Sequence, residues 1–363
     1  MRTSKLLPAA LLVGALVLSA CSSSSDGGGS GTSTTAAKPV PVDVGEVLQG
    51  LAEDVIVPSY EALGTSLATL ATDTQALCDA PSEAALTAAQ EAWTEAVAAY
   101  QRTRPAGVGP ALDDRLMSDL GFAARQTVID DLLESGDPVD HDAVADEGSA
   151  ARGLYAVEIA LFGEGSDTLT SAEGARRCEY VASVAAVAQE AAQPVIEQWT
   201  DGDAVDQFVA GLDGGPESSV ALLVNEVTQR LTELEGMGLL DMTTAETVDD
   251  LDPSRVGGPA DQRLADRKAL MAGICAAIGD GSTGISALVG AQDAGTRDRL
   301  VAADEKASKA VAALPDSVAE ALEDPKAVQA ASDAVTELKV LVSTEVASKL
   351  GVTITFSDSD GDS

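Results

Sequence analysis

Residues 153–163 read Gly-Leu-Tyr-Ala-Val-Glu-Ile-Ala-Leu-Phe-Gly, a short apolar run with a single carboxylate inside it. At 100° per residue this run predicts a helix. Its apolar face would be formed by Leu154, Val157 and Leu161. Glu158 falls inside that face, and Tyr155 lies one turn earlier on its flank. Because a carboxylate on an apolar face must be paired, protonated or bound to a cation, Glu158 is the best functional candidate. The alternative is a structural glutamate satisfied by an arginine or by helix-end amides.

Helical periodicity continues through most of the 363 residues, of which only 3% are aromatic. Apolar residues recur every three or four positions, and few segments alternate as strands do. The expected helices span 44–77 with a kink at Pro58, 83–104, 113–134, 171–199, 217–234, 260–278, 296–313 and 325–350. Glycines and a proline between 202 and 216 divide them. We therefore predict an all-α fold of two helical bundles packed side by side, the first at 43–200 and the second at 201–363 with an acidic tail.

The amino-terminal residues have the pattern of an export signal. Residues 1–20 combine Arg2 and Lys5 with an apolar stretch too short to span a membrane. The run Leu18-Ser19-Ala20-Cys21 has the form of a bacterial lipobox. It predicts cleavage before Cys21, whose acyl chains would then insert into the membrane. Residues 21–42 are rich in serine and glycine and would form a flexible tether. We expect a protein held on the outer face of the cytoplasmic membrane, or otherwise in the periplasm or on the cell surface.

The formal net charge of −37 argues against nucleic acid as a partner. Nucleic acid is an improbable ligand, because no basic patch is present to neutralise phosphates. An acidic surface concentrates cations and favours solubility, and most of these carboxylates are expected to be simply solvated.

Three cysteines remain once Cys21 is lipidated: Cys78, Cys178 and Cys275. An exported protein can keep a disulfide, so one pair and one leftover thiol are expected. We favour Cys78 with Cys178, because both lie near the ends of predicted helices. The sequence leaves the other pairings open, together with the role of Cys275.

A single histidine, His141, limits the chemistry of the chain. Neither an HExxH protease nor a zinc site with two histidines can be built, and a Ser-His-Asp triad would have to use this residue. His141 lies in a polar loop, where a solvated role is expected. A site made of oxygen ligands remains open. Tyr155 and Glu158 could contribute to binding a hard metal ion such as ferric iron or calcium.

Residues 279–284 spell Gly-Asp-Gly-Ser-Thr-Gly, which matches the G-x-G-x-x-G pattern. In nucleotide-binding folds this pattern follows a strand. Here it follows a predicted helix, so we interpret it as a turn between two helices.

The run Gly153-x-Tyr155-x-x-Glu158 resembles the G-x-H-x-x-E signature of the imelysin-like (peptidase M75) family. Further matches follow the order of that family along nearly the whole mature chain. They comprise Ala92-Trp93, residues 176–180 running on to Trp199, residues 252–255, and the ending at residues 350–362.

The resemblance implies two helical bundles with a site in the cleft where they meet. It also implies an exported, often lipid-anchored protein linked to iron uptake or to binding at the cell surface, with a peptidase label. Gly153 and Glu158 match the signature, whereas Tyr155 stands where the family has histidine. A neutral imidazole is a good metal ligand and proton carrier, but a phenol with a pKa near ~10 is a poor base. Binding is therefore expected to survive this change better than catalysis.

Our leading hypothesis is a non-catalytic lipoprotein that binds a small ligand or hard metal ion between its bundles. Tyr155 and Glu158 would lie at the centre of this site, supported by Gly153, and Ser254 and Arg255 would contribute from the second bundle. One alternative is a metallopeptidase of the M75 type, which needs a water-activating metal and a base. The other is a structural or adhesive surface protein whose motif only packs the bundle.

Overall fold

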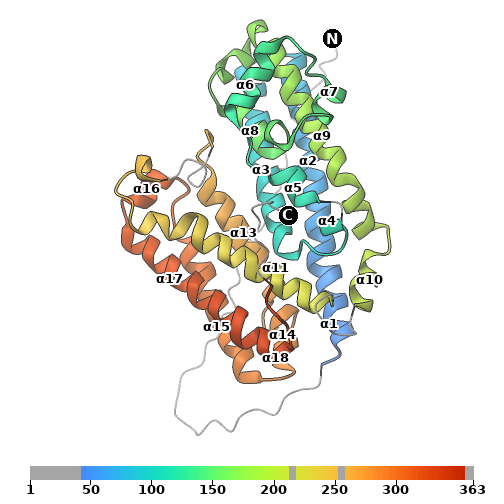
Figure 1. The fold of residues 1–363 in the computed structure, drawn as a ribbon, viewed down its shortest axis with the longest axis vertical. Coiled ribbons are helices and arrows are strands. Elements are labelled where there is room, and N and C mark those ends of the chain that lie inside the picture. The colour runs from blue at the N-terminus through green and yellow to red at the C-terminus, as the bar shows by residue number, and fades with distance from the viewer. Residues whose placement is uncertain (1–41, 114, 212–217, 252–257, 356–363) are drawn as a thin grey trace, which may run out of the picture.

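The computed structural model describes residues 42–113, 115–211, 218–251 and 258–355. These residues are helical and contain no strand, which confirms the predicted all-α class. Their long helices form two bundles that lie side by side (Figure 1). In the described part of the chain, no helix is both long and apolar enough to cross a membrane. The predicted leader, the predicted lipobox with Cys21 and all but the last residue of the predicted tether lie outside the described residues.

The first bundle is built on long helices near the amino terminus. They are α1 (Val44–Leu51), α2 (Val57–Asp79), α3 (Glu83–Thr103) and α9 (Ala175–Thr200). The single helix expected at 44–77 is interrupted by a π-helical turn, Ala52–Ile56. This turn directly precedes Pro58, which has no N–H to donate and crowds the carbonyl one turn back. The side chain of Asp43 caps the first amides of α1, and that of Ser82 caps α3.

The connection between α3 and α9 consists of short helices. They are α4 (Pro110–Asp113), α5 (Leu116–Gly121), α6 (Gln126–Ser135), α7 (His141–Ala145) and α8 (Leu154–Phe162), and α10 (Ala204–Ala210) follows α9. The single helix predicted at 113–134 is therefore wrong. Arg115 has a left-handed backbone with φ of 54°, and Phe122 is extended, so the helix is broken at both places.

The second bundle contains the remaining helices. They are α11 (Ser219–Leu234), α13 (Arg263–Ile278), α14 (Gly284–Gly290), α15 (Ala294–Ala312), α16 (Val318–Leu322), α17 (Pro325–Leu341) and α18 (Ala347–Leu350). Residues 279–284 form the predicted turn between α13 and α14. Gly279, Gly281 and Gly284 all have positive φ there, a conformation that glycine adopts without strain.

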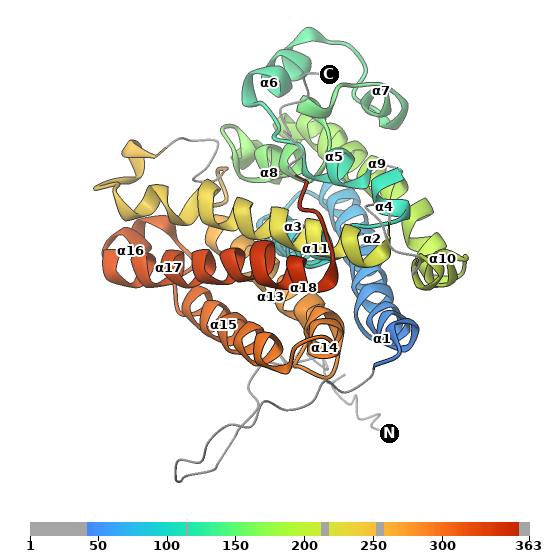
Figure 2. The ribbon, with the colours of Figure 1, turned by 60° about the horizontal axis from the view of Figure 1, so that its bottom comes forward.

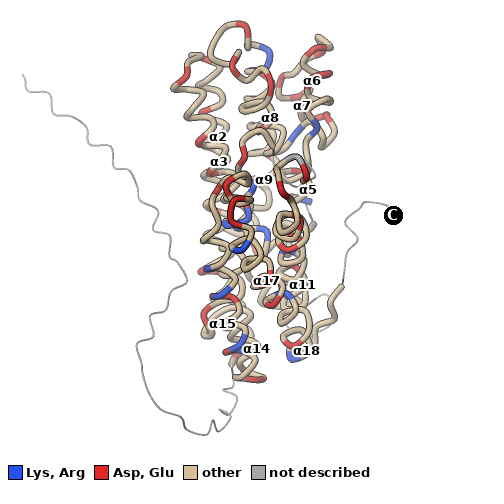
Figure 3. Tube along the Cα trace, turned by 90° about the vertical axis from the view of Figure 1, so that its left-hand side faces the viewer, with Lys and Arg blue, Asp and Glu red and all other residues tan. Residues whose placement is uncertain are grey.

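The bundles meet along several helix contacts, one of which joins α1 to α14. Helix α13 packs against α3, and α11 packs against the 3₁₀ turn Arg104–Ala106 that ends α3 (Figure 2). We call the surface between α3 and α8 on one side and α11 and α13 on the other the seam. Acidic positions are spread along both bundles (Figure 3). The division of the chain at residue 200 stays a prediction.

Cys78, near the end of α2, forms a disulfide with Cys178 near the start of α9, as the sequence favoured. The two Cα atoms are 5.4 Å apart, and the cysteines are 100 residues apart in the sequence. Cys275 is buried on α13, and its thiol donates a hydrogen bond to Oδ2 of Asp304 on α15 over 2.9 Å. The leftover thiol therefore belongs to the interior of the second bundle.

Candidate functional site

The backbone at Gly153 sets the start of α8. Its φ is +83°, and a Cβ at this position would lie 2.7 Å from the carbonyl oxygen of Asp119. Only glycine fits such a conformation at such a close approach. The indole Nε1 of Trp93 donates to the carbonyl of Leu154 over 2.7 Å, and Nε2 of Gln90 donates to the carbonyl of Leu161 over 2.9 Å. Two side chains of α3 therefore fix both ends of α8.

Helix α8 is buried on every side from Leu154 to Leu161. The apolar stripe predicted from the sequence is buried, and so are the other sides of the helix. The first bundle covers one side of the helix, and residues of the second bundle approach the other. Both Tyr155 and Glu158 are consequently held inside the protein.

Glu158 lies at the seam with only 2% of its surface exposed. Its Oε1 accepts a hydrogen bond from the backbone N–H of Ala260 over 3.2 Å, and its Oε2 lies 3.8 Å from Nη2 of Arg263. The backbone of Gly258 passes so close that a Cβ there would collide with the carboxylate. Burial raises the pKa of Glu158, while Arg263 and the Ala260 amide oppose the rise. This carboxylate of the first bundle is therefore held by the second.

Tyr155 is covered by the same arginine. The guanidinium carbon of Arg263 lies 4.3 Å from the centre of the phenol ring, within the range of a cation–π contact. The hydroxyl oxygen of Tyr155 accepts a hydrogen bond from Nε2 of Gln101 over 3.0 Å. Burial raises the pKa of Tyr155 far above its ordinary value, and Asp266 adds to the rise. The phenol therefore stays protonated at neutral pH.

Arg263 is the centre of the charged groups at the seam. Its Nη1 lies 3.9 Å from Oδ2 of Asp266, one turn along α13. Burial works to lower the pKa of Arg263, but Tyr155, Glu158 and Asp266 together raise it. Burial raises the pKa of Asp266 to about 7. At neutral pH the guanidinium is therefore charged, whereas Asp266 is close to half protonated.

A second set of polar contacts continues from Tyr155 into α11. The Oε1 of Gln101 accepts from Nη1 of Arg104 over 2.9 Å. Arg104 also donates two hydrogen bonds to the carboxylate of Glu233, at 2.8 and 2.6 Å. Arg230 donates to the same carboxylate over 3.0 Å. Burial disfavours ionisation of Glu233, but Arg104 and Arg230 outweigh it and lower its pKa. This bidentate pair ties the end of α3 to α11.

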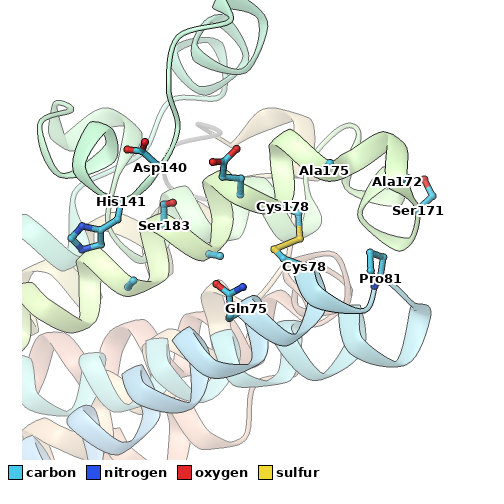
Figure 4. Close-up of a pocket in the computed structure, with 13 residues that line it drawn as sticks. Gln75, Cys78, Pro81, Asp140, His141, Ser171, Ala172, Ala175, Cys178 and Ser183 are labelled. Atoms are coloured by element: carbon cyan, nitrogen blue, oxygen red, sulfur yellow. A yellow bond between two sulfur atoms is a disulfide. The ribbon is translucent and has the colours of Figure 1, made fainter.

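Ser254 and Arg255 lie outside the described residues. His141 starts α7, where its Nε2 lies 3.0 Å from the carboxylate of Glu190. It lines a surface cavity of about 540 Å³ together with the Cys78–Cys178 disulfide (Figure 4). Among the described residues, no three side chains of His, Cys, Asp or Glu are grouped to hold a metal ion.

The partners of Glu158 and Tyr155 were missed at the sequence level because they come from distant segments. One signal was available for the second bundle. Arg230 lies among the buried apolar residues of α11, just as Glu158 does on α8. A charged side chain on an apolar face indicates a buried polar contact on either helix. Arg263 and Gln101 carry no comparable mark in the sequence.

Comparisons with known proteins agree with this architecture. The family model described as imelysin, of peptidase family M75, matches residues 56–344. An imelysin-like protein from Psychrobacter arcticum 273-4 has a similar crystal structure, with a TM-score of 0.70 and 18% identity over 87% of this chain and 100% of that one. A protein from Parabacteroides distasonis ATCC 8503, described as a "putative iron-regulated protein A precursor", gives a TM-score of 0.70 and 17% identity over 87% and 97%. No curated protein matches the chain.

Proposed function

Because this chain belongs to the imelysin (peptidase M75) family, we propose that it is a lipid-anchored, extracytoplasmic protein that binds iron in complexed form at the seam and does not hydrolyse peptides. One observation carries the proposal. The carboxylate of Glu158, in the motif of the first bundle, is buried against Ala260 and Arg263 of the second. Ligand sites occur preferentially where two domains meet, so these motif residues are well placed to contact a ligand bound between the bundles.

The absence of catalysis is argued from the residue at position 155. Peptide hydrolysis at neutral pH needs a base that can take a proton from water. The neutral phenol of Tyr155 is a poor base. Burial raises its pKa, so almost no phenolate is present at neutral pH. His141 is engaged with Glu190 at the surface cavity, away from the contacts of Glu158. Neither of these two residues can act as that base at the seam. The carboxylates of Glu158 and Asp266 remain, but both lie beside the guanidinium of Arg263, which weakens them as bases.

The form of the iron follows from the charges at the seam. A bare ferric or calcium ion would find the carboxylates of Glu158 and Asp266, but it would also be repelled by the guanidinium of Arg263. The protonated phenol of Tyr155 is a weak ligand for such an ion. An iron ion that arrives with its own oxygen ligands avoids this repulsion. A complexed cargo therefore fits the residues better than a resident metal ion.

The proposed location rests on the amino-terminal sequence. Residues 1–20 would be removed, and Cys21 would carry the acyl chains that insert into the membrane. The serine- and glycine-rich residues 21–42 would act as a tether that allows the folded bundles to reach cargo near the membrane surface. Mass spectrometry of the protein purified from membranes tests this point, with a mature amino terminus at acylated Cys21 as the expected result.

Binding is tested with the mature chain, produced without a histidine tag, and iron(III) citrate as the probe. Equilibrium dialysis should show saturable iron binding, and Glu158→Gln should weaken it about tenfold or more. Glu320→Gln, at an exposed position on α16, is the matched control and should bind as the parent does. Iron binding that Glu158→Gln leaves unchanged would contradict the proposed site. Chelator-sensitive cleavage of casein would contradict the proposed lack of hydrolysis.

A further inference from the structure

We propose that the seam recognises its ligand through a carboxylate group, which Arg263 and the hydroxyl of Tyr155 hold by donating hydrogen bonds. This inference rests on the proposed function, because it assigns the chemical class of ligand to the same site. The site would recognise the organic anion itself, so that a carboxylate ligand binds without iron as well.

The first argument is the loose pairing of Arg263. Its closest carboxylate contacts are 3.8 Å to Glu158 and 3.9 Å to Asp266, both longer than a hydrogen bond. Its Nε is buried without a hydrogen-bond partner among the described residues. Arg104, in the same seam, instead makes contacts of 2.6 and 2.8 Å to Glu233. Arg263 also donates a hydrogen bond to the hydroxyl of Tyr155, but its Nε and its two loose carboxylate contacts leave N–H groups that an incoming anion can use.

The second argument is the direction of the Tyr155 hydroxyl. Arginine can only donate, so the contact from Arg104 fixes the side-chain oxygen of Gln101 toward Arg104. The amide nitrogen of Gln101 must then face Tyr155, to whose oxygen it donates over 3.0 Å. The phenol oxygen is thus an acceptor in this contact, and its own hydrogen is left to donate elsewhere. The described partners of this oxygen, Gln101 and Arg263, are both donors, so neither of them takes that hydrogen.

The third argument is the concentration of arginine at the seam. The chain carries a net charge of −37, yet several of its arginines are gathered here: Arg104, Arg230, Arg263 and Arg267. Burial and the neighbouring Arg263 lower the pKa of Arg267 to about 10. Two guanidinium groups on successive turns of one side of α13 thus repel each other inside the protein. Asp266 and Glu233 offset part of this repulsion, and an anion placed beside the two groups would offset more of it.

The geometry of these donors selects a planar group. A guanidinium presents parallel N–H groups that match the two oxygens of a carboxylate, and a phenol adds one more donor to the same anion. A phosphate group also binds arginine, but it carries more negative charge than a single carboxylate group. Glu158 and Asp266, which lie beside Arg263, therefore repel a phosphate group more strongly. We therefore expect a carboxylate to bind at least about tenfold more tightly than phosphate.

The test is isothermal titration of the mature chain with metal-free citrate, iron(III) citrate and inorganic phosphate. Both citrate probes should bind, and phosphate should bind weakly. Arg263→Gln should weaken both citrate probes about tenfold or more, and Arg263→Lys should restore part of the loss. Tyr155→Phe, which removes only the hydroxyl, should weaken them severalfold. Arg299→Gln, at an exposed position on α15, is the matched control.

The outcomes separate the inference from the proposed function. If iron(III) citrate binds and metal-free citrate does not, the inference is overturned while the proposed function stands. If neither probe binds, the proposed function itself is overturned. Unchanged citrate binding in Arg263→Gln and Tyr155→Phe would overturn the assignment of these two residues, and phosphate binding as tight as citrate would overturn the selection of a carboxylate. Thermal melting of each variant shows whether a loss of binding reflects unfolding, and Tyr155→Phe remains informative if Arg263→Gln does not fold.

Discussion

The guanidinium of Arg263 covers the ring of Tyr155 at 4.3 Å, so that a side chain of the second bundle lies over the motif of the first. This contact links position 155, where the resemblance leads us to expect a histidine, directly to the seam. A phenol under a guanidinium gains a cation–π contact, whereas a protonated imidazole there would be repelled. A tyrosine at this position is therefore compatible with the cation above it.

Replacing Tyr155 by histidine should create metal affinity. Burial and Arg263 would both keep the imidazole neutral, and a neutral imidazole beside Glu158 and Asp266 is a good ligand for a transition metal. We expect Tyr155→His to bind Co²⁺ at least about tenfold more tightly than the parent chain. Visible absorption during Co²⁺ titration measures this, with Tyr155→Phe as a control of similar size. An unchanged spectrum for Tyr155→His would show that the metal ligands cannot converge here.

Ligand affinity should depend on pH through Asp266, whose pKa burial raises to about 7. The charged groups that face it are Arg263 and Arg267 on its own helix, Glu158 on α8 and Arg104 after α3. Below pH 7 Asp266 is mostly neutral, which leaves the seam one negative charge fewer. An anion should therefore bind more tightly at pH 6 than at pH 8, by about three- to tenfold.

Oxalate is the suitable probe for this dependence, because it stays fully ionised between pH 6 and pH 8. Asp266→Asn should bind oxalate with nearly the same affinity across that range. Isothermal titration at pH 6, 7 and 8 measures the effect in both proteins. A parallel pH dependence in the parent and in Asp266→Asn would assign the titration to another group.

Gly153→Ala should destabilise the protein strongly. The substitution would place a side chain at a φ of +83° and 2.7 Å from the carbonyl oxygen of Asp119. Backbone strain and the collision together should cost about 2–4 kcal/mol of unfolding free energy. Urea unfolding followed by circular dichroism measures the loss. Gly148→Ala, at a glycine with open space around its Cα, is the control and should change the stability little.

Asp304→Asn should change how stability depends on pH. Burial raises the pKa of Asp304 to about 6, and Oδ1 has no hydrogen-bond partner among the described residues. An acid whose pKa is higher in the folded state than in the unfolded state binds more protons when folded, so its contribution to stability falls as the pH rises from about 4 to about 6. Asparagine removes this loss and can still accept the hydrogen bond from Cys275.

We expect Asp304→Asn to be more stable than the parent chain at pH 7.5, by about 1–3 kcal/mol, and closer to it at pH 4.5. Urea unfolding at both pH values measures the difference. Equal stability differences at the two pH values would show that Asp304 titrates normally in the folded protein.

The fold could be predicted from the sequence wherever apolar spacing is regular over several turns. Helices α3, α11 and α13 follow the predicted ranges to within a few residues. The prediction of one helix at 113–134 is wrong because Arg115 adopts a left-handed backbone conformation. The residue type arginine gives no indication of such a conformation. A backbone conformation imposed by tertiary packing leaves no periodic signal.

The candidate site could be predicted only from its own helix. The sequence identified Glu158 because a carboxylate interrupts an apolar run, and the structure buries it. The identity of its partner could not be predicted, because Arg263 lies more than 100 residues further along the chain and is one of several arginines in a polar segment. Contacts between the bundles depend on how α13 packs on α3, and no local pattern encodes that packing.

The cross-link between Cys78 and Cys178 encloses α3 to α8 in a covalent ring of the chain. A protease that cuts once at the exposed turn of Gly136 and Asp137 would open this ring without separating the fragments. The motif helix would stay attached to α2 through sulfur, and the fragments would part only after reduction. At the proposed location outside the cytoplasm, where proteases are common and reductants scarce, a nicked molecule would thus keep its seam assembled.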